Sequence, residues 1–156
     1  MKKIEQIFIA GSVVGLLMSL FDIPLYSLIV SLFFMTLALT YFYLGFALFN
    51  NIRFRNILKA ESYKGLGPWR ISVAIGTGIA LSDLTVGFMF TTLDYPMARS
   101  LLTFGLVLTA IMLLLASVRN AKEKDRFYRN IILRCAVFIV IGSVFMLLPE
   151  NLFLRS

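Results

Sequence analysis

The sequence predicts an all-α integral membrane protein with about five transmembrane helices, the N-terminus inside and the C-terminus outside. Three observations predict this fold class. Of the 156 residues, 60% are hydrophobic and 15% charged, with a mean hydropathy of +0.90, whereas soluble domains are about 45–50% apolar and about 25% charged. Five stretches reach the roughly 20 apolar residues that a membrane-spanning helix needs. Lys and Arg residues gather on one side of these stretches.

Composition also excludes several function classes. The chain has one Cys and no His, which removes disulfide frameworks, Cys/His zinc sites, His-ligated haem and mechanisms with a histidine base. Acidic residues do not cluster, so the usual catalytic constellations cannot be assembled. We therefore expect a non-enzymatic protein with no catalytic residue, cofactor or metal site.

The predicted helices form two hairpins and a single fifth helix within one transmembrane domain, residues 1–156. The first hairpin occupies residues 4–49 and the second occupies residues 71–118. Basic loops at 50–70 and 119–130 follow the hairpins, and the fifth helix covers residues 131–148. The five apolar stretches are Ile4–Phe21, Leu25–Phe49, Ile71–Phe90, Ser100–Val118 and Ile131–Leu148.

The first two stretches are predicted to be separate helices because Asp22 and Pro24 lie between them. Proline disfavours helix in the preceding residue and begins a new helix well. A cleaved signal peptide is the alternative for the N-terminus, but a signal peptidase site requires small residues at alternating positions. Ser19-Leu20-Phe21 lacks them, so we expect the first helix to be retained.

The loop at 50–70 interleaves basic and apolar residues at near-helical spacing. This pattern predicts a short helix on the anionic inner leaflet, followed by a turn at Gly65–Trp69 in which Trp69 is an interface anchor. The loop at 119–130 mixes both charge signs and is predicted to be a solvated helical turn.

Membrane orientation follows from the positions of Lys and Arg, which are enriched in cytoplasmic loops. With five helices and the N-terminus inside, thirteen of the fifteen basic residues fall on the cytoplasmic side, and only Arg99 and Arg155 fall outside. The net charge of +7 is therefore a topology signal. The expected partners are the lipid bilayer, with anionic lipid at the cytoplasmic face, and other membrane subunits or a second copy, not nucleic acid.

The two hairpins resemble each other at an offset of 72 residues. Residues 14–24 align without gaps on residues 86–96, and the identical pairs are Val, Gly, Asp and Pro. The matching turn residues are Asp22 and Pro24 in the first hairpin and Asp94 and Pro96 in the second. The hairpins also have the same predicted orientation, as a tandem repeat requires. A tandem duplication and a chance match of apolar residues are both open at this point.

Small residues recur at helical spacing in the first and third predicted helices. Helices in lipid associate by close backbone approach at such residues. Either these faces hold one subunit together, or one of them, that of the first helix, docks on a partner subunit. The helix-packing positions are Gly11, Gly15, Ser19, Gly76, Ala80 and Gly87.

Asp83 and Arg134 are the candidate functional charges inside the membrane. Asp83 lies about 18 Å into the third span at 1.5 Å per residue, where an ionised acid is expensive. It either forms structural hydrogen bonds to hydroxyl or backbone groups or carries protons. Arg134 is the candidate counter-ion, but it lies only about 6 Å inside the boundary, from which it can snorkel to the head groups.

Residues 76–116 resemble the N-terminal transmembrane hairpin of the gliding-motility GldL family, membrane stator subunits of a proton-driven motor in Bacteroidota. The matching residues are Val86, Gly87, Phe90, Pro96, Ala98, Gly105 and Ala110. The aromatic before the proline is kept as Tyr95, whereas Thr91 replaces a family lysine and Thr109 an acid. The resemblance therefore implies the hairpin architecture and a bacterial source, without proton-powered work.

Two functions from different classes follow from these observations. The first is a non-enzymatic, multi-pass protein of the bacterial inner (cytoplasmic) membrane that serves as a scaffold or accessory subunit of a larger assembly. The second is a small transporter or proton-conducting subunit that uses Asp83.

Overall fold

The computed structural model describes residues 2–21, 23–50, 52 and 67–147, and this part of the chain is all-helical. Its five helices are each long and apolar enough to cross a membrane, which confirms the predicted all-α, multi-pass class. Their bounds are α1 Lys2–Leu20, α2 Tyr26–Phe49, α3 Pro68–Thr92, α4 Ala98–Glu123 and α5 Arg126–Leu147.

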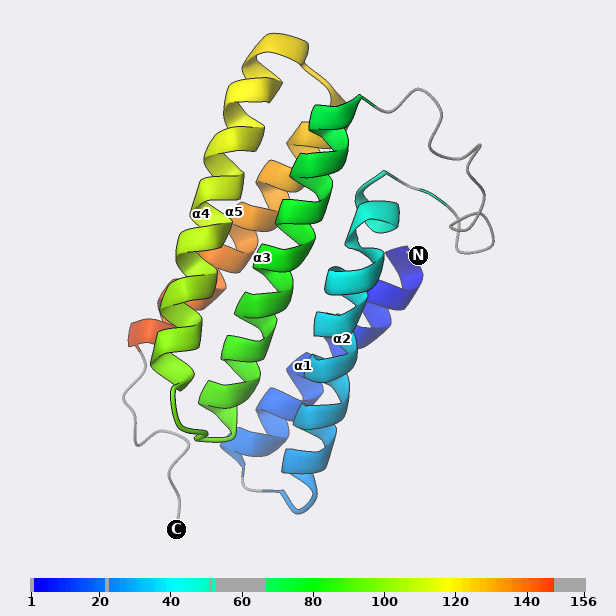
Figure 1. Cartoon of the computed structure of the whole chain (residues 1–156). Helices are drawn as coiled ribbons and strands as arrows, with labels where there is room; N and C mark the ends of the chain where they lie inside the picture. The colour runs from blue at the N-terminus through cyan, green and yellow to red at the C-terminus, as the bar shows by residue number, and fades with distance from the viewer. Residues whose placement is uncertain (1, 22, 51, 53–66, 148–156) are drawn as a thin grey trace.

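Successive helices run in opposite directions (Figure 1). The ends of α2 and α4 and the starts of α3 and α5 therefore share one end of the bundle, which we call the basic end. Its described cations are Arg70, Arg119, Lys122, Lys124, Arg126 and Arg129. The predicted amphipathic segment at 53–63 lies outside the described residues.

Several helices extend beyond their apolar stretches because hydropathy marks the hydrocarbon layer, whereas a helix continues into the head-group region. Helix α3 begins at Pro68, where proline fits a first helical position. Helix α4 continues to Glu123, and Lys124, with a left-handed φ of 46°, ends it. Asp125 then accepts a hydrogen bond from the backbone N–H of Phe127 at 3.0 Å, as helix-capping side chains do. The predicted loop at 119–130 is thus a two-residue turn.

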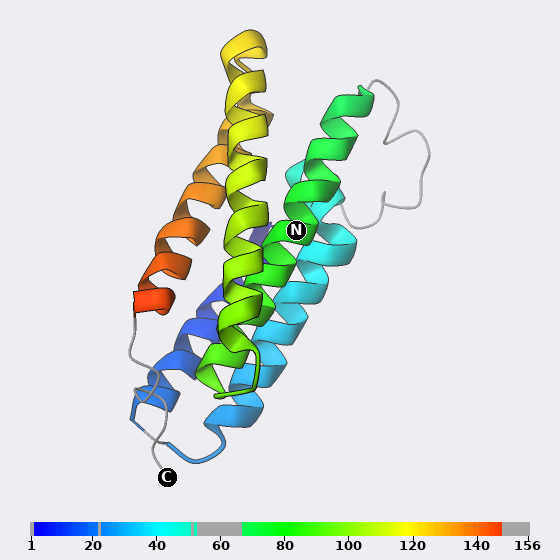
Figure 2. The same ribbon diagram turned by 60° about the vertical axis from the view of Figure 1, so that its left-hand side comes forward.

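Helix α3 is central in the bundle. It packs against α2 on one side and α4 on the other, and also contacts α5 (Figure 2). Ala74, Leu81 and Leu84 of this helix are completely buried. The ring of Phe88 stacks near Phe145 of α5, with centroids 4.8 Å apart. In its most apolar part 67% of the α3 residues are buried, a higher share than in any other described helix.

Glycines allow α3 to approach both neighbouring helices. A Cβ built on Gly78 would lie 2.6 Å from the backbone oxygen of Tyr41, and Gly78 faces Gly45 across the α2–α3 contact. A Cβ on Gly105 of α4 would lie 2.7 Å from the Leu84 Cα. Such distances leave no space for a side chain, so both contacts are backbone to backbone.

The predicted small-residue faces also lie between helices of this chain. Gly11 and Gly15 meet Phe33 and Val30 of α2, and Gly76 and Gly87 meet Met112 and Leu102 of α4. Ala80 is buried and Ser19 is half-buried. The glycine faces of α1 and α3 are thus occupied within the subunit.

The two hairpin turns have the same backbone geometry at the 72-residue offset. Leu25 and Met97 both adopt left-handed φ angles, 71° and 68°. Four backbone hydrogen bonds around the first turn recur around the second with every donor and acceptor shifted by 72 residues; the donors are Phe21, Ile23, Tyr26 and Ile29 in the first turn and Leu93, Tyr95, Ala98 and Leu101 in the second.

The residues of the aligned turn motif occupy these turns. Pro24 and Pro96 lie directly before the left-handed residues, and Asp94 has a φ of 54°. Asp22 lies outside the described residues. The Gly15–Val30 contact also corresponds to Gly87–Leu102, so equivalent positions pack the two hairpins.

We expect Gly105→Ala to destabilise the bundle. Alanine is the better helix former by about 1 kcal/mol, but overpacking against the Leu84 backbone costs about 1–3 kcal/mol. The thermal unfolding temperature in detergent, followed by circular dichroism, should fall. Gly67→Ala is the control, since a Cβ there meets nothing within 4 Å. Equal unfolding temperatures for both variants would contradict the close contact.

Candidate functional site

A buried cluster of three polar side chains joins α1, α2 and α5. The Arg134 guanidinium forms a two-pronged ion pair with Glu5, in which Nη2 lies 2.9 Å from Oε2 and Nη1 bonds Oε1. The Tyr41 hydroxyl donates a hydrogen bond to Glu5 Oε1 at 2.9 Å. The guanidinium also lies over the ring of Phe49, 5.3 Å from its centroid. The Glu5 side chain is 7% exposed and that of Arg134 is 22% exposed.

Helix geometry brings these residues to one depth. Tyr41 lies eight residues before the end of α2 and Arg134 eight residues after the start of α5, so both lie about 12 Å from the helix ends at the basic end. Glu5 belongs to the first turn of α1, so α1 starts deeper than its neighbours. The Tyr41 ring packs edge-on against Phe138 of α5, with centroids 5.6 Å apart.

The cluster has a structural role that its chemistry explains. Opposite charges satisfy each other, and the tyrosine hydroxyl occupies a further site on the carboxylate. A buried pair of this kind is expensive to break, because the remaining charge is left without a partner. Helix α1 packs on α2 but makes little backbone contact with α5 in the described part of the chain. The ion pair therefore ties α1 to α5.

Sequence reasoning did not single out Glu5, although the residue lies within the first predicted apolar stretch, Ile4–Phe21. A usable signal was present. Charged side chains within membrane segments often pair with one another, and Glu5 is the one acid in the first predicted apolar stretch.

Asp83, the other predicted charge, lies apart from this cluster. It is fifteen residues into α3, about 22 Å from the helix start. The residue is half-buried, and its Oδ2 atom is buried without a hydrogen-bond partner among the described residues. Arg134 is bound to Glu5, so the structure does not bring the two predicted charges together.

Three buried threonines on α3 and α4 donate hydrogen bonds within their own helices. Thr77 donates to the Val73 carbonyl at 2.7 Å and Thr85 to the Leu81 carbonyl at 2.6 Å. Thr109 donates to the Gly105 carbonyl at 2.7 Å. These bonds use the only proton that each hydroxyl has. None of the three hydroxyls therefore donates to Asp83.

A second polar network lies at the basic end. Arg70 of α3 bonds Asp125 at 2.6 Å and Asn50 at 2.9 Å, and its guanidinium lies 4.3 Å from the Phe127 ring centroid. Nearby, the Arg119 guanidinium lies 4.7 Å from the centroid of Trp69, the predicted interface anchor. These contacts join α3 to the α4–α5 turn.

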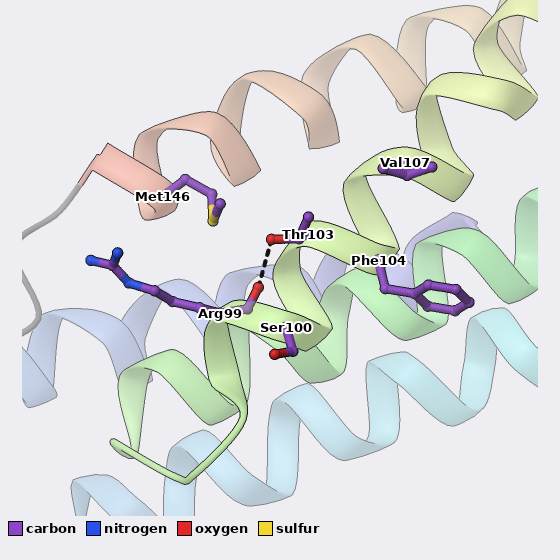
Figure 3. A pocket seen from close by; sticks show the side chains of 6 residues that line it. All are labelled: Arg99, Ser100, Thr103, Phe104, Val107 and Met146. Carbon is purple, nitrogen blue, oxygen red and sulfur yellow. Dashed lines mark hydrogen bonds between the residues drawn. The ribbon is translucent and has the colours of Figure 1, made fainter.

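Among the hollows that described residues line, three differ in character. A shallow groove of about 540 Å³ lies between the start of α4 and the end of α5 (Figure 3). In this view Arg99 extends beside Met146, and the Thr103 hydroxyl bonds the Arg99 backbone carbonyl. A polar pocket of about 160 Å³ lies at the α4–α5 turn, and an apolar pocket of about 140 Å³ involves α1 and α5. No group of three metal-binding His, Cys, Asp or Glu residues occurs in the described part of the chain.

Comparisons with known protein families, curated proteins and solved structures find no match for this chain.

We expect Arg134→Met to destabilise the protein by about 3–5 kcal/mol, because Glu5 is left buried without a counter-ion. The double variant Glu5→Gln/Arg134→Met should recover most of this loss, since no charge is then buried. The matched control is Arg119→Met, whose partner Glu123 is 46% exposed; exposed pairs contribute about 1 kcal/mol or less. Unfolding in detergent measures all three, and an equally unstable double variant would contradict the pairing.

Proposed function

We propose that this chain is a non-enzymatic, multi-pass protein of the bacterial inner membrane that serves as a scaffold or accessory subunit of a larger membrane assembly. The observation that carries the proposal is the Asp83 carboxyl group, half-buried in the middle of the central helix with one oxygen unsatisfied within the described residues. In lipid no water supplies the missing bond, and an unsatisfied polar group there is costly.

A donor from another membrane subunit, or from a second copy of this chain, would satisfy Asp83. Polar side chains that bond across helices stabilise association within membranes. The Thr77 and Thr85 hydroxyls of the same helix donate to carbonyls of that helix, whereas Asp83 is only partly buried. The glycine faces are occupied internally, so Asp83 is a better candidate contact than the α1 face.

The alternative function is a small transporter or proton-conducting subunit, and the same carboxyl group favours it. No described cation pairs with Asp83, and an acid without a counter-ion in the membrane is suited to take up a proton. The two proposals differ in whether Asp83 must exchange a proton or only accept a hydrogen bond.

Charge distribution supports the proposed orientation, with the N-terminus inside and the C-terminus outside. The described cations of the basic end surround the starts of α3 and α5, and cytoplasmic loops carry such an excess. Anionic lipid is the proposed partner at this face. Lys124, Arg126 and Arg129 line the polar pocket at the α4–α5 turn, and the charge of Asp125 in the same pocket is paired with Arg70.

We also propose that the two hairpins are a tandem duplication. Turn residues, left-handed φ angles and glycine contacts recur at the same 72-residue offset, and apolar composition alone does not produce matching turn geometry. The resemblance of residues 76–116 to the gliding-motility hairpin agrees with a subunit of a membrane assembly.

Substitutions at Asp83 separate the two functions. For an accessory subunit, Asp83→Asn should preserve assembly because the amide still accepts a hydrogen bond, and Asp83→Leu should weaken it by about 1–3 kcal/mol. Native electrophoresis of the solubilised complex and membrane abundance measure the effect, with Asp94→Asn in the turn as the control. Proton flux through parent proteoliposomes that both variants abolish while remaining inserted would favour the alternative.

Reporter fusions test the orientation. Fusions after Asn50 and Arg119 should report the cytoplasm, and fusions after Asp94 and Leu147 should report the outside, because basic loops are retained in the cytoplasm. Alkaline phosphatase and a fluorescent protein provide opposite signals at each site. A cytoplasmic signal after Leu147 would reduce the number of spans and overturn the orientation.

A further inference from the structure

The apolar pocket of about 140 Å³ lies among α1, α2, α3 and α5. Its α1 wall includes Ile9, Ser12 and Leu16, and its α5 wall includes Val137 and Ile141. The only hydroxyls in the wall belong to Ser12 and Thr85, and both donate to carbonyls of their own helices, at 2.9 Å and 2.6 Å. The pocket therefore presents no free hydrogen-bond donor to an occupant.

The Glu5–Tyr41–Arg134 cluster lies next to the pocket, on its side toward the basic end. Glu5 lies one helical turn before Ile9, and Arg134 one turn before Phe138, another wall residue. Tyr41 packs its ring against Phe138. We call this cluster the roof of the pocket. Because its charges satisfy each other, it offers no unpaired charge to a polar ligand.

The mouth of the pocket opens sideways on the bilayer. Its rim residues are apolar and partly exposed: Val13 is 49% exposed, Val137 48% and Ile141 40%. All belong to helices that are long and apolar enough to cross a membrane. Water requires two to four polar partners to remain in a cavity, and a dry apolar cavity of roughly 150 Å³ takes up apolar ligands. Hydrocarbon is the medium that reaches this mouth.

The length and the depth of the pocket fit a hydrocarbon chain that runs along the bilayer normal. The wall runs from Ile9 to Leu16 on α1 and from Val137 to Phe145 on α5, about 10–12 Å along the helix axes. Phe145 lies two residues from the end of α5, opposite the basic end. A chain that follows the bilayer normal from the far leaflet would enter this space and end below the roof.

We infer that this pocket binds a hydrocarbon chain of a membrane phospholipid, which enters between α1 and α5 from the leaflet opposite the basic end. The lipid fills the gap between two helices that the Glu5–Arg134 pair ties together at one end only. This inference goes beyond the proposed assembly function and does not depend on Asp83.

Photolabelling tests the site with the full-length chain in vesicles of phosphatidylcholine. A small fraction of this lipid carries a diazirine midway along one chain, and peptide mass spectrometry locates the label after irradiation. We expect label to concentrate on residues 9–16 of α1 and 137–145 of α5. Equal labelling of Leu114, which is 66% exposed on α4, would overturn the inference.

Matched variants distinguish the pocket from the general lipid surface. Ser12→Phe places a ring in the pocket and should abolish its labelling, whereas Val14→Phe, at a 51% exposed position outside the wall, should not. If Ser12→Phe does not fold, Ile141→Trp and Val140→Trp form a second pair with the same expectation. Undiminished labelling in a folded pocket variant, or a non-lipid compound that co-purifies in the pocket and blocks the label, would overturn the assignment.

Discussion

Helix α3 can occupy the centre of the bundle because glycines remove the side chains at its closest contacts. Inside a bilayer, apolar side chains gain little by leaving lipid for protein, so helices associate through van der Waals packing at short distance. The Gly45–Gly78 contact supplies that distance toward α2, and Gly105 supplies it toward α4. The positions of Asp83, the apolar pocket and the polar roof all follow from where α3 holds its neighbours.

The charged side chains lie at three depths in the bundle, and the groups that stabilise them differ from one depth to the next. At the basic end Arg70 and Arg119 contact acids that are partly exposed to water and the faces of aromatic rings, and water there weakens electrostatic interactions. Further in, Arg134 requires a two-pronged partner and a tyrosine hydroxyl. Asp83 lies deeper still and has an oxygen without a described partner, which is why the functional proposals centre on it.

Hydropathy was sufficient to predict the five helices, because the bilayer imposes one length and one composition on every span. It did not predict the end of α4 or the start of α5, since Glu123 and Arg126 are helical although they lie outside the apolar stretches. The spacing of glycines predicted packing faces, but spacing cannot say which helix each face meets. That information depends on the tertiary arrangement, as the contacts of Gly11 with α2 and Gly76 with α4 illustrate.

The candidate site was harder to predict than the fold. Asp83 could be recognised from its position in an apolar stretch, whereas its orphaned oxygen depends on threonines bonding their own helices. The partner of Arg134 depended on how deeply α1 enters the bundle. The apolar stretches alone do not show that the first turn of α1, which contains Glu5, lies at the depth of Arg134.

The Glu5–Arg134 pair also has a consequence for biosynthesis. Its two members are 129 residues apart, so the ribosome makes the acid long before the arginine that neutralises it. Until α5 enters the membrane, α1 contains a carboxylate without its counter-ion, and α1 is the least buried of the described helices. Insertion of α5 therefore supplies the counter-ion for the carboxylate on α1. A chain interrupted before α5 keeps Glu5 in the membrane without its counter-ion, which is energetically expensive.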